Sequence, residues 1–192
     1  MGSMLLQQGI SYFNPDEAAQ RIRLANASMT RNDANSAAWH EGKRLLQRAI
    51  AEQLDFTFET TLGGNTIPDL LEKALQSGIE VRVWYAGLNS PELHIARVRA
   101  RVEQGGHPIP EPMIRQRYHR SRVNLIRLVP HLTELMVYDN SKEADPWAGL
   151  APEPLLVLHM KRGSIVRTCD LPAAPTWTKP ILMAAFRCVP KQ

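Results

Sequence analysis

The sequence predicts an α/β fold in which a largely parallel sheet is flanked by helices. The first supporting observation is an alternation along the chain: runs rich in β-branched and aromatic residues alternate with longer runs whose apolar residues recur every three or four positions. The second is that polar residues gather directly after the predicted strands, where open parallel sheets bind ligands. With 192 residues the chain can enclose one sizeable core, so a single domain is expected.

Helix and strand boundaries follow from capping and breaking residues. Pro15 followed by two acids is typical of a first helical turn, and Ser90-Pro91-Glu92 gives the same signal later in the chain. Gly78 is expected to close one helix, and Gly163 to lie in the turn of a C-terminal β-hairpin. The last twenty residues are expected to form a strap across the surface. Strands are expected at 10–14, 54–59, 79–87, 134–140, 154–160 and 164–168, and helices from 15, over 35–53, over 66–77, from 91 to the Gly105-Gly106 break, and over 113–129.

Composition and charge restrict the class of protein. The sequence is 44% hydrophobic and 22% charged, as in an ordinary soluble globular protein, and its net charge of +4 favours an anionic partner without identifying it. Cys169 and Cys188 lack metal-ligand spacing and argue against a disulfide framework, so the reducing cytoplasm is the simplest location. No apolar run approaches the roughly 18 residues of a membrane span, and the start lacks a signal-peptide pattern. Met1-Gly2-Ser3 resembles a cloning remnant ahead of a second initiator, Met4.

Three predicted strands end in polar residues that are able to form a site. The first strand delivers Asn14 and Asp16, the second Glu59-Thr60-Thr61, and the strand ELMVYDN delivers Asp139-Asn140-Ser141. Because the carboxyl ends of parallel strands meet at one edge of a sheet, these side chains are expected to lie together. Simpler alternatives stay open: Asp16 caps a helix, residues 139–141 form a turn, and the threonines end a strand before a helix cap at Thr66.

A second group of candidate residues consists of arginines. Two predicted helices, joined by the Gly- and Pro-rich link GGHPIPEP, carry eight arginines between residues 97 and 127 against Glu103 and Glu111. Arg97 and Arg101 are four residues apart and share a helix face. Such helices fit a mobile lid over phosphate groups, because the planar guanidinium meets phosphate oxygens bidentately and stays charged. A solvated basic face and a nucleic-acid footprint are the alternatives, and charge alone does not separate them.

Four stretches of the sequence resemble the zeta toxin family of P-loop kinases: FETTLGGNT, the long block from WYAGLNSPEL to RYHRSRVNL, VYDNS and LLVLHMKRGSIV. The match runs from about residue 10 to residue 167, and ARVEQGGHPIP…IRQRYHRS is its most specific part. The resemblance implies a P-loop kinase-like parallel sheet, one domain over 4–192 and a lid over about 97–122. It also implies a bacterial, cytoplasmic kinase that is paired with an antitoxin. The implied reaction moves the γ-phosphate of ATP, with Mg²⁺ as cofactor, to the sugar 3′-hydroxyl of a UDP-sugar. The expected UDP-sugar is UDP-N-acetylglucosamine.

The resemblance also assigns roles to individual residues. Asp16, in NPDE, resembles the acid of the family's N-A-D motif and would be the general base on the sugar hydroxyl. Glu59 and Thr61, in FETT, would line the sugar-nucleotide pocket, with Glu59 also near the metal ion, and Arg101 and Arg117 would neutralise the transferred phosphoryl group. An acid, a metal ion and arginines suffice, because this chemistry needs mainly positioning and charge neutralisation. Further candidates are Asn14 and Glu41 for the pocket and Arg97, Arg115 and Arg120 for the lid.

One part of the family pattern is missing from the sequence. No G-x-x-x-x-G-K-[ST] phosphate cradle occurs in the 192 residues: the pair Gly42-Lys43 has Ala37 in place of the first glycine, is followed by Arg44, and falls inside a predicted helix. The chain is therefore expected to begin just after its own P-loop, with LLQQG as the tail of the helix that follows the loop. The first P-loop strand would then be absent, which would leave an unpaired edge on each of the two strands that normally flank it. Three explanations stay open: truncation at an internal methionine, an upstream segment missing from this sequence, and true loss of the motif. Efficient transfer from ATP is not expected of this chain.

Two other functions stay open. A non-catalytic remnant would bind a partner protein through an exposed sheet edge. A nucleic-acid-binding module would use the arginine helices, and its affinity would fall steeply as the salt concentration rises. A lid over phosphate groups predicts saturable nucleotide binding instead.

Overall fold

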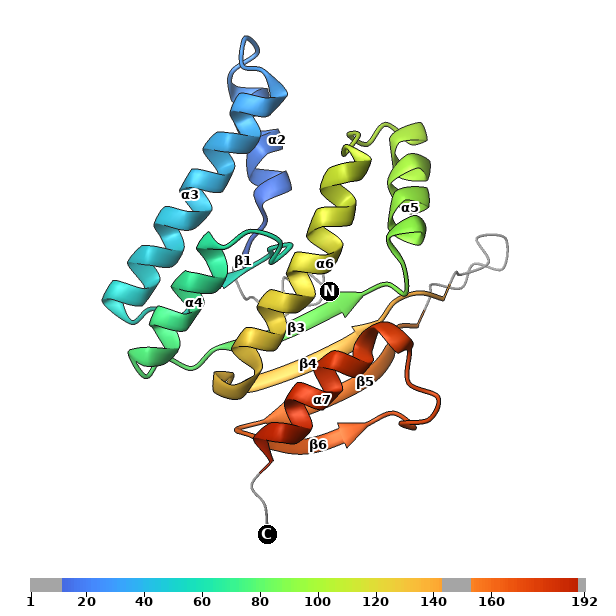
Figure 1. The fold of residues 1–192 in the computed structure, drawn as a ribbon. Coiled ribbons are helices and arrows are strands. Elements are labelled where there is room, and N and C mark those ends of the chain that lie inside the picture. The colour runs from blue at the N-terminus through green and yellow to red at the C-terminus, as the bar shows by residue number, and fades with distance from the viewer. Residues whose placement is uncertain (1–11, 143–152, 190–192) are drawn as a thin grey trace. The chain divides into compact units, whose positions relative to one another are not determined.

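The computed structural model describes residues 12–142 and 153–189 of this α/β protein (Figure 1). The chain divides into two compact units, Met1–Thr61 and Leu62–Gln192, and each is described by itself. The described elements of the first unit are β1 (Tyr12–Phe13), α2 (Pro15–Ala25), α3 (Arg31–Glu52) and β2 (Thr57–Phe58). Those of the second are α4 (Thr66–Gln76), β3 (Arg82–Gly87), α5 (Pro91–Glu103), α6 (Glu111–Leu128), β4 (Glu134–Asp139), β5 (Leu155–Lys161), β6 (Ser164–Thr168) and α7 (Lys179–Cys188), with single 3₁₀ turns at Val129–His131 and Thr176–Thr178. The predicted helix tail LLQQG lies outside the described residues.

The first unit is a helical hairpin beside two very short strands. Small side chains let the helices approach closely, because Ala19 on α2 and Ala34 and Ala38 on α3 form the buried contact. The second helix begins at Arg31, four residues earlier than predicted, because the Thr30 side chain caps it by accepting a hydrogen bond of 3.2 Å from the Asp33 N–H. Among the described residues, the two predicted strands shrink to two residues each.

The second unit contains a four-stranded sheet in the order β3-β4-β5-β6. Strands β3 and β4 are parallel, whereas the β4–β5 and β5–β6 pairs are antiparallel. The expected largely parallel sheet is therefore wrong for this unit, since its sheet is mixed. The predicted C-terminal hairpin is confirmed: Arg162 and Gly163 both have positive φ angles, and a turn of two such residues joins antiparallel strands.

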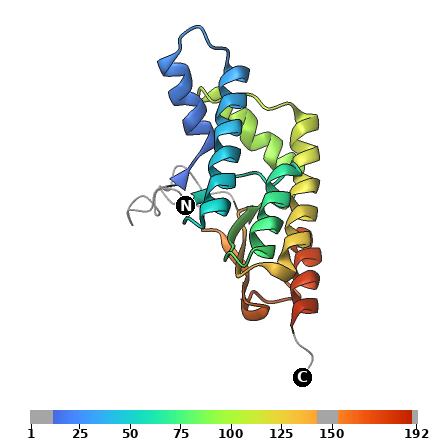
Figure 2. The same cartoon turned by 90° about the vertical axis from the view of Figure 1, so that its left-hand side faces the viewer.

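Helices α6 and α7 lie on one face of this sheet (Figure 2). The core between them and the sheet includes the fully buried side chains of Leu125, Leu128, Leu135, Val137, Leu158 and Ile181. Helix α7 corrects the expectation of a C-terminal surface strap. The segment forms a helix because Pro180 stands in its first turn and the buried residues Ile181, Leu182 and Ala185 recur at helical spacing.

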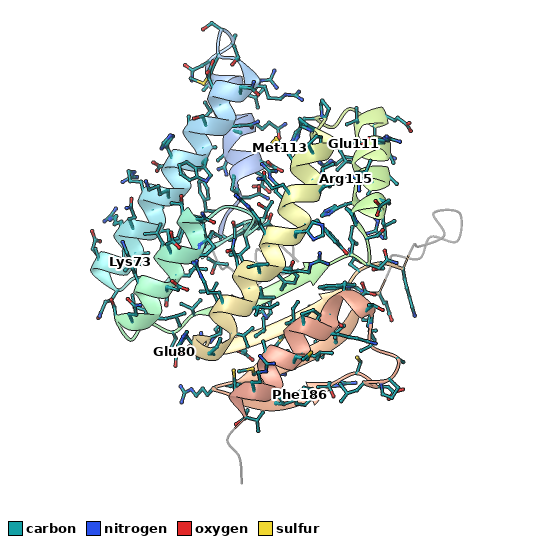
Figure 3. The ribbon with its side chains drawn as sticks, in the orientation of Figure 1. Lys73, Glu80, Glu111, Met113, Arg115 and Phe186 are labelled. Atoms are coloured by element: carbon teal, nitrogen blue, oxygen red, sulfur yellow. The ribbon has the colours of Figure 1, made fainter. Side chains whose placement is uncertain are left out.

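Helices α5 and α6 form a pair of antiparallel neighbours connected through the predicted glycine break. Gly105 has a φ of +89°, a conformation that glycine adopts without steric cost. Two ion pairs join the helices: Arg115 to Glu92 at 2.6 Å, and Arg99 to Glu111. Glu111 and Arg115 accordingly point from α6 toward α5 (Figure 3). In the described ranges, none of the helices has the length and apolar character needed to cross a membrane.

Candidate functional site

The carboxyl ends of β1 and β2 lie side by side in the first unit. The two strands pair in parallel, with Tyr12 opposite Thr57 and Phe13 opposite Phe58. The ladder continues one step further, because the Glu59 N–H donates a hydrogen bond of 2.9 Å to the Phe13 carbonyl. Asn14 and Glu59 are therefore the first residues beyond two parallel strands, as the sequence predicted, and they stand where α/β sheets bind ligands.

Asn14 connects the start of α2 to Glu59. Its Oδ1 accepts hydrogen bonds from the backbone N–H groups of Asp16 at 2.9 Å and Glu17 at 3.2 Å, which makes it the cap of α2. Its Nδ2 donates to Glu59 Oε2 at 3.0 Å. Both ends of the amide are thus engaged, so one side chain fixes the helix start and the orientation of the Glu59 carboxylate.

Asp16 stands in the first turn of α2 with an exposed side chain. The alternative that Asp16 caps the helix is wrong, because Asn14 is the cap and Asp16 contributes only its backbone N–H to it. The Asp16 carboxylate makes no hydrogen bond or ion pair to another residue in the described ranges. It lies at the N-terminal end of the helix, where the partial positive charge of the backbone stabilises an anion. An exposed, unpartnered carboxylate in this position is able to accept a proton from a bound hydroxyl group.

Glu41 is engaged in a bidentate ion pair on α3. Arg44 donates to its two carboxylate oxygens at 2.7 and 2.8 Å. The hydrogen bonds from Arg44 lower the pKa of Glu41, and the carboxylate is oriented along its own helix. The neighbouring Gly42-Lys43 pair lies inside α3, and a β-carbon on Gly42 would lie 2.5 Å from the ring of Phe13. Gly42 therefore gives close packing of α3 on β1, and the pair forms no phosphate cradle.

The polar residues after β3 and β4 in the second unit form a hydrogen-bonded turn. The Asp139 carboxylate accepts hydrogen bonds from Ser141 Oγ and, at 3.0 Å, from Trp177 Nε1. Ser141 Oγ in turn accepts from the Asn89 N–H at 2.8 Å, and Tyr118 Oη donates to the Asn89 carbonyl at 2.8 Å. These hydrogen bonds connect the ends of β3 and β4 to α6 through Tyr118 and to the segment before α7 through Trp177. This supports the alternative that residues 139–141 are structural.

The arginines of α5 and α6 divide into two groups, and the first group has partners inside the unit. Besides the ion pairs of Arg99 and Arg115, the Arg97 guanidinium donates to the Lys142 carbonyl at 3.2 Å. Arg122 lies over the Tyr118 ring, with Cζ 3.7 Å from the ring centre. Arg127 at the end of α6 binds Asp69 and Glu72 of α4, both at 2.7 Å. These arginines contribute to packing and orientation within the unit.

The second group is Arg101, Arg117 and Arg120, none of which has an ion-pair partner among the described residues. Two effects lower the pKa of His94 on α5. Partial desolvation is the larger, and the positive charges of Arg97 and Arg101 add to it. Uncompensated guanidinium groups on two neighbouring helices favour binding of an anion.

Arg117 lies against the glycine loop that contains Gly63, and the sequence did not predict this contact. A β-carbon on Gly63 would lie 2.8 Å from Arg117 Cγ. Asn124, seven residues further along α6 and only 6% exposed, donates hydrogen bonds of 2.8 Å to the carbonyls of both Leu62 and Gly64. The available signal was an asparagine within the apolar stretch VNLIRL, because an amide at a buried helix position needs partners.

Between α5 and α6 lies a cavity of about 350 Å³. Its lining is mainly apolar, with Ile95, Val98, Val102, Ile109 and Ile114 on the walls, and Arg99 and Glu111 beside them. No group of three or more metal-ligating side chains is present in the described part of the chain. Glu59 is therefore not part of such a group within those residues.

Comparison with known proteins finds a relative of part of the chain. No protein-family model matches the chain, and no solved structure matches it. A protein of Haemophilus influenzae (strain ATCC 51907 / DSM 11121 / KW20 / Rd) that carries the name "Uncharacterized protein" is 35% identical over 103 residues. The matched region covers 54% of this chain and 71% of the relative. The chain belongs to the family of this Haemophilus influenzae protein.

Proposed function

We propose that the protein is a zeta-toxin-like kinase whose acceptor is the sugar 3′-hydroxyl of a UDP-sugar, with UDP-N-acetylglucosamine as the expected substrate. The observation that carries the proposal is the hydrogen bond of 3.0 Å from Asn14 to Glu59 at the carboxyl ends of two parallel strands. It brings together two of the residues that are candidates for binding the sugar nucleotide: Glu59, from the resemblance, and Asn14, from its place at a strand end. The family resemblance supplies the reaction, and the local geometry is compatible with it.

Asp16 is the proposed general base. Its carboxylate has no hydrogen-bonding partner in the described ranges and is exposed, so a sugar hydroxyl can approach it and pass it a proton as the oxygen attacks phosphorus. Glu59, held by Asn14, is the proposed acceptor for a second sugar hydroxyl. Separate roles for the two carboxylates agree with their different surroundings, because only Glu59 is oriented by a neighbouring side chain.

Arg101 and Arg117 are the proposed phosphate-binding arginines. Both lack a carboxylate partner within the described residues, whereas Arg97 and Arg115, the alternatives on the same helices, are held by a carbonyl and by Glu92. An arginine already engaged by a carboxylate must break that contact before it binds phosphate. An unengaged arginine binds the negative charge without that loss.

The donor side fits the described residues less well. ATP supplies the γ-phosphate in this family, but Gly42-Lys43 is packed into α3 and the 192-residue sequence contains no other Gly-Lys pair. For Mg²⁺, a single carboxylate such as Glu59 is sufficient when phosphate oxygens supply the other ligands. The proposal for this chain is accordingly limited to binding the acceptor, with Asp16 placed to take the hydroxyl proton only when a phosphoryl donor is also bound.

Calorimetric titration with UDP-N-acetylglucosamine, alone and with Mg-ATP, tests the proposal. We expect saturable binding of the sugar nucleotide, and weaker binding by the Glu59→Gln variant. The Arg82→Gln variant is the control, because Arg82 is an exposed arginine at the start of β3 that forms ion pairs with Glu80 and Glu134. Failure to bind the sugar nucleotide, combined with binding of a single-stranded oligonucleotide whose affinity falls steeply with salt, would support the nucleic-acid alternative and contradict the kinase.

A further inference from the structure

We propose that Gly63 and Asn124 are positioning residues that hold Arg117 ready to bind phosphate. The inference rests on the proposed function, which assigns Arg117 to a phosphate group, and adds the residues that position it. All of the contacts lie within the second unit.

The stem of Arg117 rests on the backbone of the loop before α4. A β-carbon on Gly63 would lie 2.8 Å from Cγ, 3.1 Å from Cβ and 3.3 Å from Cα of Arg117. A real β-carbon essentially never approaches another atom as closely as 2.8 Å, so no other residue fits at position 63 unless Arg117 or the loop moves. The absence of a side chain at this position therefore allows the arginine stem to lie directly on the loop.

Asn124 makes that loop a rigid support. Its two amide hydrogens are donated to the carbonyls of Leu62 and Gly64, at 2.8 Å each, so the contacts lie on both sides of Gly63 in the chain. The Asn124 side chain is buried, which strengthens both bonds and makes their loss costly. Leu62 is also buried, at 5% exposure, and its φ of +53° is unusual for a leucine, so the loop is held in a conformation that it would not adopt freely.

Arg117 and Asn124 are seven residues apart and therefore lie on the same face of α6. The loop runs along this face and contacts both. Because the stem is held while the guanidinium has no partner in the described part of the chain, the arginine loses less conformational freedom when it binds an anion. The expected ligand is a phosphate or diphosphate group, which a guanidinium binds bidentately.

The test uses two neighbouring glycines. Gly63→Ala places a methyl group against Arg117, whereas Gly64→Ala places one where no atom lies within 4 Å, and neither glycine has a positive φ angle. Binding of UDP-N-acetylglucosamine and, separately, of pyrophosphate is measured by calorimetry for both variants, for Arg117→Ala and for the Gly63→Ala/Arg117→Ala double variant. Melting temperatures are recorded for all four, so that loss of binding is separated from loss of folding.

We expect Gly63→Ala to weaken anion binding by about tenfold, the scale of one charge-assisted hydrogen bond, and Gly64→Ala to change it by less than about twofold. In the Arg117→Ala background, Gly63→Ala should weaken binding no further, because both substitutions remove the same contact. Equal effects of the two glycine substitutions, or an undiminished effect of Gly63→Ala without Arg117, would overturn the inference.

The two ligands separate this inference from the proposed function. If pyrophosphate binds with the expected dependence on Gly63 and Arg117 while the sugar nucleotide does not bind, the inference stands and the proposed substrate is wrong. If the sugar nucleotide binds and the two glycine variants behave alike, the proposed function stands and the inference fails. If neither ligand binds, both are overturned.

A second variant tests the support itself. Asn124→Asp replaces Nδ2, which donates both hydrogen bonds, with an oxygen that faces the same two carbonyl oxygens, so the loop should be released. Faster hydrogen exchange at the backbone amides of residues 62–65 is the expected result in the folded variant. Unchanged exchange would overturn the role of Asn124. Since a buried substitution can prevent folding, the Gly63 and Gly64 pair remains the deciding comparison.

Discussion

Gly87 lies in direct contact with the indole of Trp177: a β-carbon on Gly87 would be 2.4 Å from Cη2 of the ring. Gly87 ends β3, and Trp177 lies in the 3₁₀ turn before α7. The Trp177 side chain is 7% exposed and also packs on Tyr85, with ring centres 6.1 Å apart. The C-terminal segment is therefore anchored on the carboxyl end of the edge strand β3.

The Gly87→Ala variant should be destabilised because the added methyl group overlaps a buried ring that has little room to move. Overpacking of this kind costs about 1–3 kcal/mol of the free energy of unfolding. Urea denaturation measures the change, and Gly64→Ala, with open space at its β-carbon, provides the matched control. Equal stability of the two variants would contradict the close contact.

Asp139 should behave as a structural hydrogen-bond acceptor. Asp139→Ala leaves the Trp177 N–H and the Ser141 hydroxyl without their acceptor, which should cost about 1–3 kcal/mol of stability. Asp139→Asn keeps a carbonyl oxygen for these donors and should cost less than about 1 kcal/mol. Thermal unfolding of both variants gives the comparison. If both lose binding of UDP-N-acetylglucosamine while remaining as stable as the wild type, Asp139 belongs to the site and the structural assignment is wrong.

Tyr85 gives a prediction for alkaline pH. Burial raises the pKa of its phenol, and the hydroxyl shares a hydrogen bond of 2.8 Å with Ser121. A raised pKa in the folded state means that the folded protein binds the phenolic proton more tightly than the unfolded chain does. The resulting stability is fully present below the unfolded value of about 10 and is lost as the pH rises through the folded pKa.

Stability measured between about pH 8 and pH 11 should therefore fall more steeply in the wild type than in Tyr85→Phe, which has no phenol to ionise. Desolvation and Glu17 also raise the pKa of Tyr12, so ultraviolet titration should show Tyr12 and Tyr85 ionising late among the four tyrosines of the sequence, and this late component should decrease in the variant. A late component of undiminished size in Tyr85→Phe would contradict the raised pKa of Tyr85.

Much of the helical structure was predictable because local signals encode it. Ser90 caps α5 as expected, with its hydroxyl accepting from the Leu93 N–H at 3.1 Å, and α2 starts at Pro15 as expected. Helix α7 was not predicted, because prolines and a short apolar end are also typical of an extended segment. The antiparallel pairing of β4 with β5 was not predicted, because strand direction there depends on long-range pairing, which periodicity does not report.

The candidate site was predictable only in part, for a similar reason. The rule that parallel strands deliver polar residues to one edge correctly placed Asn14 beside Glu59. The partners of the arginines were not predictable, because contacts such as Arg115 with Glu92 depend on the register between two helices. The contact of Gly63 with Arg117 joins residues 54 positions apart, and no local pattern marks it.

Asn14 should contribute to binding of the sugar nucleotide as well as to capping of α2. A comparison with Thr30, which caps α3, separates the two roles. Asn14→Ala and Thr30→Ala each remove the side-chain cap of a helix in the first unit, so each should cost about 1 kcal/mol of stability. Only Asn14→Ala also removes the hydrogen bond that orients Glu59. Calorimetry should therefore show weaker binding of UDP-N-acetylglucosamine by Asn14→Ala and unchanged affinity for Thr30→Ala.

The Asn14→Asp variant completes this comparison. Aspartate still caps the helix through an acceptor oxygen, but it has no N–H to donate and places a second negative charge beside Glu59. Stability near the wild-type value with affinity as low as that of Asn14→Ala would show that the donated hydrogen bond matters for binding. Wild-type affinity in Asn14→Asp would mean that Asn14 acts only as a cap, and the contact with Glu59 would then carry no part of the proposed site.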